Sequence, residues 1–180
     1  MSTAADEPPP GPERLEAAWE KLYAAFHLVV LRKATLAAAG NTQDAWDGTQ
    51  HAFIQAWENL HNPRAKQVGN WRGWLIQVAV RHVLFARRDR GSVPLEEAGH
   101  MDGRVLLEDH VVLKETYQGI MEAIGQLSER QRQALVLVHI AGCTTAEAAA
   151  DMEVSTSTVR NLIHQARARL AAATREASDD

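Results

Sequence analysis

The sequence predicts an all-α protein made of two small helical domains joined by a flexible linker. Along the 180 residues, no stretch alternates apolar and polar side chains as a half-buried strand does. Apolar side chains instead recur three and four positions apart, which is the period of a helix that faces a core. Residues 91–104, "GSVPLEEAGHMDGR", interrupt this pattern with glycine, proline and acidic residues, a composition typical of a linker between domains.

The first domain is predicted to begin after a disordered tail. Residues 1–12 are acidic and proline-rich, as many disordered tails are. Helical spacing predicts one helix over 13–39, and we expect Gly40 and Asn41 to end it as C-cap residues. A second helix is predicted over 42–60.

A loop and a third helix complete the first domain. Residues 61–70, "HNPRAKQVGN", are predicted to form the loop because Asn62-Pro63 and Gly69 break any helical period. The apolar spacing then predicts a helix over 71–90, which ends before Gly91.

The second domain is predicted to begin with two helices, over 106–125 and 128–142. The second of these starts with Ser128 and Gln131 at the spacing of a capping box, in which each side chain bonds the other residue's backbone amide. Helical spacing and the break at Gly142 set its predicted end.

Residues 144–170 are predicted to form a helix-turn-helix. Thr144 and Glu147 have capping-box spacing and start a short helix. The four residues "MEVS" that follow have the length of a helix-turn-helix connection, and Ser155 is a good N-cap for the last helix. Glu153 stands where such turns usually have a left-handed glycine, which predicts a slightly strained or differently shaped turn.

The last helix is predicted to have one buried and one polar side. Its buried stripe consists of Val159, Ile163, Ala166 and Leu170, and the opposite side carries Asn161, His164, Gln165 and Ala168. Arg160 and Arg167 flank the stripe on one side, and Leu162 and Arg169 on the other. Amide, imidazole and guanidinium groups contact base edges and phosphates. With the capped turn before it, this polar side favours DNA binding over an ordinary solvated surface.

Charge is segregated along the chain. The net charge of −4 does not suit a protein that coats nucleic acid by bulk charge. Residues 60–90, however, hold seven lysines and arginines against one aspartate, and residues 154–175 hold four arginines and no acid. Local positive surfaces of this kind are compatible with DNA binding.

Composition also bears on compartment and chemistry. The single cysteine excludes an internal disulfide, and the start of the chain lacks the basic and apolar regions of a signal peptide, so we expect a cytoplasmic protein without membrane insertion. His139 and Cys143 are four residues apart, but no second pair completes a zinc site. No phosphate-binding glycine loop or nucleophile elbow occurs, so we expect neither a cofactor nor an enzyme.

Two blocks of sequence resemble the extracytoplasmic-function (ECF) class of bacterial sigma factors. In the first half, "DAWDGTQHAFIQAW" is followed at a family-like spacing by "NWRGWLIQVAVRHVLFARRDR". In the second half, "LSERQRQALVLVHIAGCTTAEAAADMEVSTSTVRNLIHQARARL" follows the family's helix-turn-helix pattern. The resemblance extends over residues 13–173, and its two blocks in order are far more specific than a helix-turn-helix alone.

The resemblance implies a role for each part of the chain. Residues 13–91 would bind the clamp helices of the RNA polymerase core and recognise the −10 promoter element, while the second domain would also bind the polymerase flap. The β and β′ subunits of the core are the implied partners. Residues 92–105 would form the linker toward the active-site channel. Residues 106–173 would bind the −35 element, and residues 174–180 would form a tail. An anti-sigma factor is a further partner that the family implies.

The resemblance also implies site residues. For core polymerase binding they are Asp44, Asp47, Gln50, Phe53 and Trp57. For the −10 element and melting they are Arg64, Lys66, Arg72, Trp74, Arg81, Arg87 and Arg88. For the −35 element they are Arg130, Arg132, Ser155, Thr156, Thr158, Arg160, Asn161, His164, Gln165 and Arg167. The loop at 61–70 lies where the family chooses its −10 bases, although Trp71 and Trp74 are favoured as core residues over base-stacking ones.

The chain departs from the family pattern at a few positions. Gly48-Thr49 replaces an apolar pair and is expected to weaken the apolar side of the second helix. Arg81 and Phe85 replace an asparagine and an aspartate, and Leu162 replaces an arginine. Two alternatives therefore stay open: a helix-turn-helix regulator that senses a ligand, and a sigma-like protein that binds polymerase or an anti-sigma partner without initiating transcription.

Overall fold

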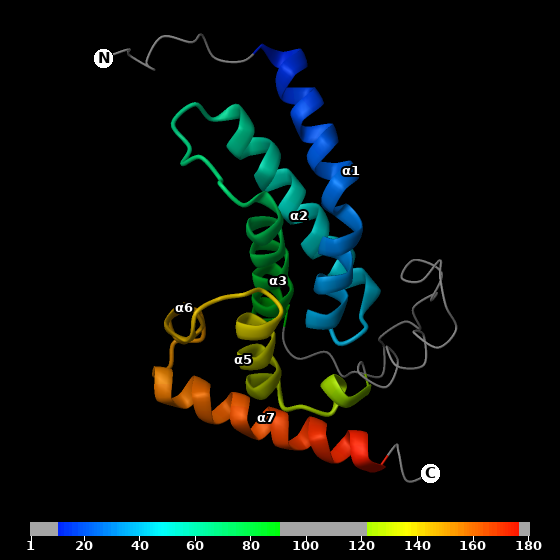
Figure 1. Ribbon diagram of the computed structural model, residues 1–180, viewed down its shortest axis with the longest axis vertical. Helices are drawn as coiled ribbons and strands as arrows, with labels where there is room; N and C mark the ends of the chain where they lie inside the picture. The colour runs from blue at the N-terminus through cyan, green and yellow to red at the C-terminus, as the bar shows by residue number, and fades with distance from the viewer. Residues whose placement is uncertain (1–10, 91–121, 177–180) are drawn as a thin grey trace.

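The computed structural model describes residues 11–90 and 122–176, and all regular structure in these two segments is helical (Figure 1). This confirms the all-α prediction. The predicted linker at 92–105 lies outside the described residues. So does most of the helix predicted over 106–125, of which residues 122–125 are described and helical.

The first domain is a bundle of three helices, as predicted. They are α1 (Pro12–Ala37), α2 (Thr42–His61) and α3 (Trp71–Arg90), and each packs against the other two. Figure 1 shows them side by side, with α1 and α2 running in opposite directions. Val30, Leu75 and Val80 are among the fully buried side chains of this core. The period-3.6 spacing of the apolar residues thus positions all three helices around one core.

The connection between α1 and α2 differs from the prediction. Helix α1 ends at Ala37, and the turn that follows places Ala39 and Gly40 at positive φ angles of 50° and 88°. Asn41 does not end α1 but begins α2, because its side-chain oxygen accepts a hydrogen bond from the Asp44 amide at 3.0 Å. An asparagine side chain at a helix start bonds a backbone amide that has no partner within the helix. A glycine is the usual residue at a helix end, so Gly40 takes that role and Asn41 takes the other.

Gly48 lies at a close contact between α2 and α3. A Cβ atom at this position would lie 2.6 Å from a Val83 methyl carbon and 2.9 Å from the Ala79 carbonyl oxygen. The neighbouring Thr49 is also buried, and its hydroxyl donates to the Ala45 carbonyl at 2.7 Å. Gly48, which together with Thr49 we expected to weaken the apolar side of α2, is therefore what allows the two helices to pack so closely.

The second domain consists of α5 (Glu129–His139), α6 (Thr145–Asp151) and α7 (Thr156–Glu176). Both predicted capping boxes are present, with Ser128 and Thr144 as the N-caps. Helix α5 ends three residues before the predicted Gly142, which has a φ of 74° in the turn to α6. A glycine in the left-handed conformation normally follows the last helical residue. Gly142 therefore does signal the end of α5, but it lies beyond the helix and not at its last residue.

The helix-turn-helix connection has the predicted length, since α6 ends at Asp151 and α7 begins at Thr156. Glu153 adopts a φ of 55°, so of the two predicted possibilities the turn is the strained, left-handed one. The Arg130 guanidinium donates to the Met152 carbonyl at 3.0 Å and so holds this turn from α5. The Ser155 hydroxyl accepts from the Thr158 amide at 3.1 Å, which confirms Ser155 as the cap of α7.

Replacing Glu153 by glycine is expected to stabilise the protein by about 0.5–1 kcal/mol, because relief of the left-handed strain exceeds the extra chain entropy of glycine. Thermal unfolding of the purified variant measures this gain. Glu153→Ala is the matched control, because it removes the carboxylate but keeps the Cβ atom that causes the strain. An equal gain from both variants would show that the carboxylate, not the backbone, limits stability.

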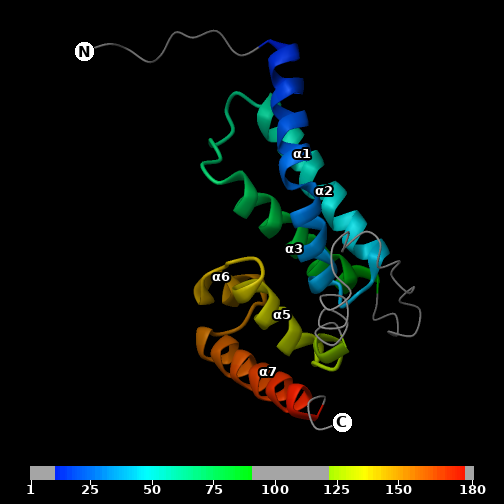
Figure 2. The same ribbon diagram turned by 45° about the vertical axis from the view of Figure 1, so that its right-hand side comes forward.

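The two domains touch mainly through α5. This helix contacts α3 and α1 on one side and packs against α6 and α7 on the other. In both Figure 1 and Figure 2, α5 lies between α3 and α7, with α7 crossing the end of the molecule away from the start of α1. The helix-turn-helix also touches the middle of α3, where Arg81 pairs with Asp151 of α6 at 2.8 Å.

Candidate polymerase and DNA interfaces

An apolar hollow of about 450 Å³ opens on the surface between α1 and α2. It is lined by Trp19, Tyr23, Gln50, Phe53, Ile54 and Trp57. Ile54 is 55% exposed and Trp57 37% exposed, so large apolar side chains face water here. Exposed apolar surface gathered around a hollow is typical of an interaction site.

Ring contacts hold the walls of this hollow in place. Tyr23 stacks on Trp19 with ring centroids 5.4 Å apart and meets Phe53 edge-on at 4.9 Å. Trp57 meets Trp19 edge-on at 5.9 Å, and the Trp19 indole donates to the Phe53 carbonyl at 3.2 Å. Because these side chains fix one another, the hollow is preformed and a partner would lose little side-chain entropy on binding it.

Three of the five predicted polymerase-binding residues meet at this hollow. They are Gln50, Phe53 and Trp57. Asp44 and Asp47 are half-buried near the start of α2 and do not line it. Sequence reasoning missed Trp19, Tyr23 and Ile54 as residues of this site, since helical spacing does not show which side chains of two helices meet at the surface.

A second cavity, of about 530 Å³, lies beside the loop between α2 and α3. Lys66 and Trp74, both predicted at the −10 site, line it together with Asn59, Gln67 and Gln77. Asn70 closes the loop by accepting a hydrogen bond from the Gly73 amide at 3.0 Å, at the start of α3. The cavity thus combines a cation, several amides and one wall of an indole ring, which suits an unstacked base.

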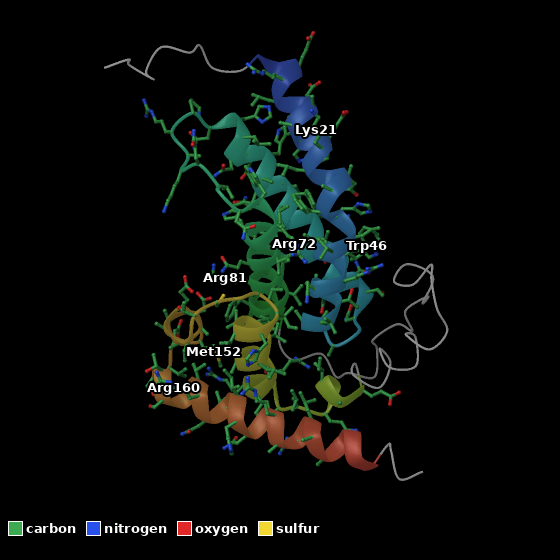
Figure 3. All side chains as sticks on the ribbon, in the orientation of Figure 1. Lys21, Trp46, Arg72, Arg81, Met152 and Arg160 are labelled. Atoms are coloured by element: carbon green, nitrogen blue, oxygen red, sulfur yellow. The ribbon has the colours of Figure 1, made fainter. Side chains whose placement is uncertain are left out.

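The other predicted −10 residues are spread along the loop and α3. Arg64 and Arg72 are exposed, and Figure 3 shows Arg72 near the start of α3. Arg81 is half-exposed and paired with Asp151 of α6. Arg87 and Arg88 belong to α3, but their side chains lie outside the described ones. Trp71 and Trp74 pack against the core, as favoured, with ring centroids 5.6 Å apart.

Helix α7 has the predicted division into two sides. Val159, Ile163 and Ala166 are buried, while Arg160, Asn161 and His164 are exposed. Figure 3 shows Arg160 near the start of α7, on the outside of the second domain. Leu162 is half-buried and packs against the core, so it widens the packing side of the helix in place of the family arginine.

Several predicted −35 residues have partners inside the second domain. Arg130 bonds the Met152 carbonyl, Gln165 accepts from Gln131 at 3.1 Å, and Arg167 bonds His139 at 3.1 Å. Arg132 is only 8% exposed, so its guanidinium is not displayed on the surface. Ser155 and Thr158 bond each other at the start of α7, and Thr156 is exposed there. The outward groups are therefore concentrated in the first half of α7.

His139 and Cys143 each contact a different arginine. His139 accepts its hydrogen bond from Arg167, and burial together with the Arg167 charge lowers the pKa of His139, as suits a neutral acceptor. Cys143 is buried, and its sulfur lies 3.9 Å from the Arg81 guanidinium. Within residues 11–90 and 122–176, no three histidine, cysteine or carboxylate side chains are grouped to hold a metal ion. In the same segments, no helix has the length and hydropathy of a bilayer-spanning one.

Known proteins match this chain in both sequence and structure. The family model for sigma-70, region 4, matches residues 117–170. The RNA polymerase sigma-H factor of Pseudomonas aeruginosa is 30% identical over 145 residues, which are 71% of each protein. The ECF RNA polymerase sigma factor SigE of Mycolicibacterium smegmatis is 31% identical over 73% of this chain, and the match spans about half of SigE, 52%.

A solved structure shows the same fold. The sigma factor RpoE of Bartonella quintana, crystallised with the anti-sigma factor NepR, aligns with a TM-score of 0.55 and 20% identity. The alignment covers 88% of this chain and 97% of RpoE, so it includes both domains. By this fold, its helix-turn-helix and its sequence relatives, the chain belongs to the ECF family of RNA polymerase sigma factors, non-enzymatic proteins that direct transcription initiation with RNA polymerase.

Proposed function

We propose that this sigma factor binds the polymerase core, the −10 element and the −35 element through the three separate surfaces described above. The α1–α2 hollow docks on the polymerase core, the 62–70 loop and its cavity receive the −10 element, and the first half of α7 contacts the −35 element. The observation that carries this assignment is the hollow itself. It brings the exposed Gln50 and Trp57 together with the buried Phe53 at one largely apolar hollow, in a chain whose other domain displays a polar helix of a helix-turn-helix.

Partners and location follow from the same assignment. RpoE of Bartonella quintana was crystallised with an anti-sigma factor, and we propose that this chain binds one too. Its exposed aromatic hollow is a surface that such a partner would cover while the polymerase is absent. Because polymerase and promoter are the working partners, we place the protein in the cytoplasm.

One experiment separates the proposed function from its alternatives. The purified protein is mixed with core polymerase and assayed for transcription on a library of genomic promoters. Initiation at a defined set of promoters supports promoter-specific initiation, and variants in each surface then test the individual assignments. Core binding without initiation would leave a polymerase-binding regulator, and absence of core binding would leave a helix-turn-helix protein of another kind.

Arg160→Ala is expected to weaken binding to the −35 element by about 1–3 kcal/mol if Arg160 grips a guanine. Arg160 is exposed at the start of α7, where a guanidinium reaches base edges or phosphates. Anisotropy titrations with duplexes carrying the selected promoter and base-substituted versions measure the loss. Arg169→Ala, at an exposed arginine about two and a half turns further along α7, is the control. Equal losses from both variants on every duplex would contradict a base contact by Arg160.

A further inference from the structure

Two glutamine side chains join the start of α5 to α7. The Gln131 Nε2 atom donates to the Gln165 Oε1 atom at 3.1 Å, across 34 residues of sequence. Gln131 is only 6% exposed and belongs to the capping box of α5. Gln165 is exposed and lies in the first half of α7, the segment proposed to contact the −35 element. A buried side chain therefore holds one that lies on the proposed DNA-binding surface.

The capping box fixes which way the Gln131 amide group points. The Gln131 Oε1 atom lies 3.2 Å from the backbone nitrogen of Ser128. A backbone N–H can only donate, so the side-chain atom that faces it has to be the carbonyl oxygen. The Nε2 atom of the same planar group is then the one that faces Gln165. The Gln131 amide group cannot turn over without losing its bond to Ser128.

The Gln131 donor in turn fixes the Gln165 amide group. A donor has to meet an acceptor, so Gln165 directs its Oε1 atom at Gln131. The Nε2 atom of Gln165 is then the group left to contact DNA, and it can only donate. A glutamine that is free to turn pairs with adenine through its oxygen and its nitrogen together. Held in this orientation, Gln165 has only its donor to offer.

We propose that Gln131 is a positioning residue that makes Gln165 select a keto base, guanine or thymine, at one position of the −35 element. This inference rests on the proposed role of α7 and adds the base preference of one of its side chains. The Gln165 N–H group donates to O6 of guanine or O4 of thymine in the major groove. Adenine and cytosine present an amino group at the corresponding place, and two donors that face each other form no hydrogen bond.

Gln131→Glu is the variant that tests this arrangement. A glutamate keeps the capping box, since its carboxylate also accepts from the Ser128 amide. An ionised carboxylate cannot donate, so Gln165 is expected to turn over and donate its Nε2 atom to Glu. The Gln165 oxygen then faces outward and accepts from an amino base. Because one hydrogen bond changes binding about three- to ten-fold, we expect a keto preference of that size in the wild type and an equal amino preference in the variant.

The measurement uses holoenzyme reconstituted from the full-length protein and core polymerase. Sequencing the promoters that it binds, from a library with a randomised −35 element, gives the preference for each base at each position. We expect Gln131→Glu to change one position only, from guanine or thymine to adenine or cytosine. Gln126→Glu is the matched control, because it makes the same substitution at an exposed position five residues before Gln131, and it should change no position. Gln165→Ala should remove the preference at the position that Gln131→Glu changes.

Three results would overturn the inference and leave the proposed function in place. The first is a −35 preference that Gln165→Ala leaves unchanged at every position, since Gln165 would then read no base. The second is a wild-type preference for adenine or cytosine at the position that depends on Gln165. The third is a keto preference that persists there in Gln131→Glu. If the wild-type holoenzyme enriches no −35 sequence at all, the proposed role of α7 fails, and this inference fails with it.

Discussion

Ile54→Asp is expected to weaken binding to core RNA polymerase by about 2–4 kcal/mol, roughly a 30- to 700-fold rise in Kd. Among the residues that the structure describes, Ile54 is the most exposed large apolar side chain, and it lies at the α1–α2 hollow. An aspartate there places a charge that a docked partner would have to desolvate without pairing it. Titration of fluorescently labelled core polymerase with the variant measures the loss.

Leu28→Asp is the matched control for this experiment. Leu28 is 47% exposed on α1 but does not line the hollow, so the same change in charge and polarity falls outside the proposed interface. Both substitutions are at exposed positions, and thermal unfolding should show that both variants fold. If Ile54→Asp binds the core as tightly as Leu28→Asp does, the hollow is not the polymerase-binding surface.

Gly48→Leu, which restores an apolar residue of the family pattern, is expected to destabilise the protein by about 3 kcal/mol, at the upper end for overpacking. The Cβ atom alone would lie 2.9 Å from the Ala79 carbonyl oxygen, and a backbone atom in α3 cannot rotate away. The two helices would have to separate, and the Tm is expected to fall by roughly 10–20 °C. Circular dichroism during heating measures it.

Two further variants show whether the close contact is the cause. Gly69→Ala is the control, because a Cβ atom there meets nothing within 4 Å. Gly48→Ala combined with Val83→Ala should lose less stability than the two single changes added together, since Val83 supplies the nearest contact at 2.6 Å. Wild-type stability in Gly48→Leu would show that α2 and α3 can repack around a large side chain.

Local signals in the sequence predicted most of the fold. Helix α3 has its predicted bounds, both capping boxes form, and the turn at Glu153 is the strained, left-handed one of the two predicted possibilities. Each of these depends on residues within about one helical turn of one another, and neighbours at that range are visible in the sequence. The prediction failed at Asn41, where two helix ends adjoin and the same residue type can cap either.

The candidate sites were predictable only in part. The last helix showed its buried and polar sides in advance because a helix repeats its contacts every three or four residues. The partners of Arg130, Gln165 and Arg167 were not predictable, since each lies on another helix of the domain. Likewise, nothing local distinguishes the exposed Trp57 and Ile54 from the buried Phe53 beside them.

The sequence by itself determined that this chain is a two-domain helical protein with a helix-turn-helix, because helical period, caps and turn length are local properties. Only the tertiary structure decided that Gly48 is a contact between helices, that aromatic residues of α1 and α2 share one hollow, and that Arg81 pairs with Asp151. These features join residues far apart in the chain, and the physical reason they form is packing in three dimensions, which no short stretch of sequence encodes.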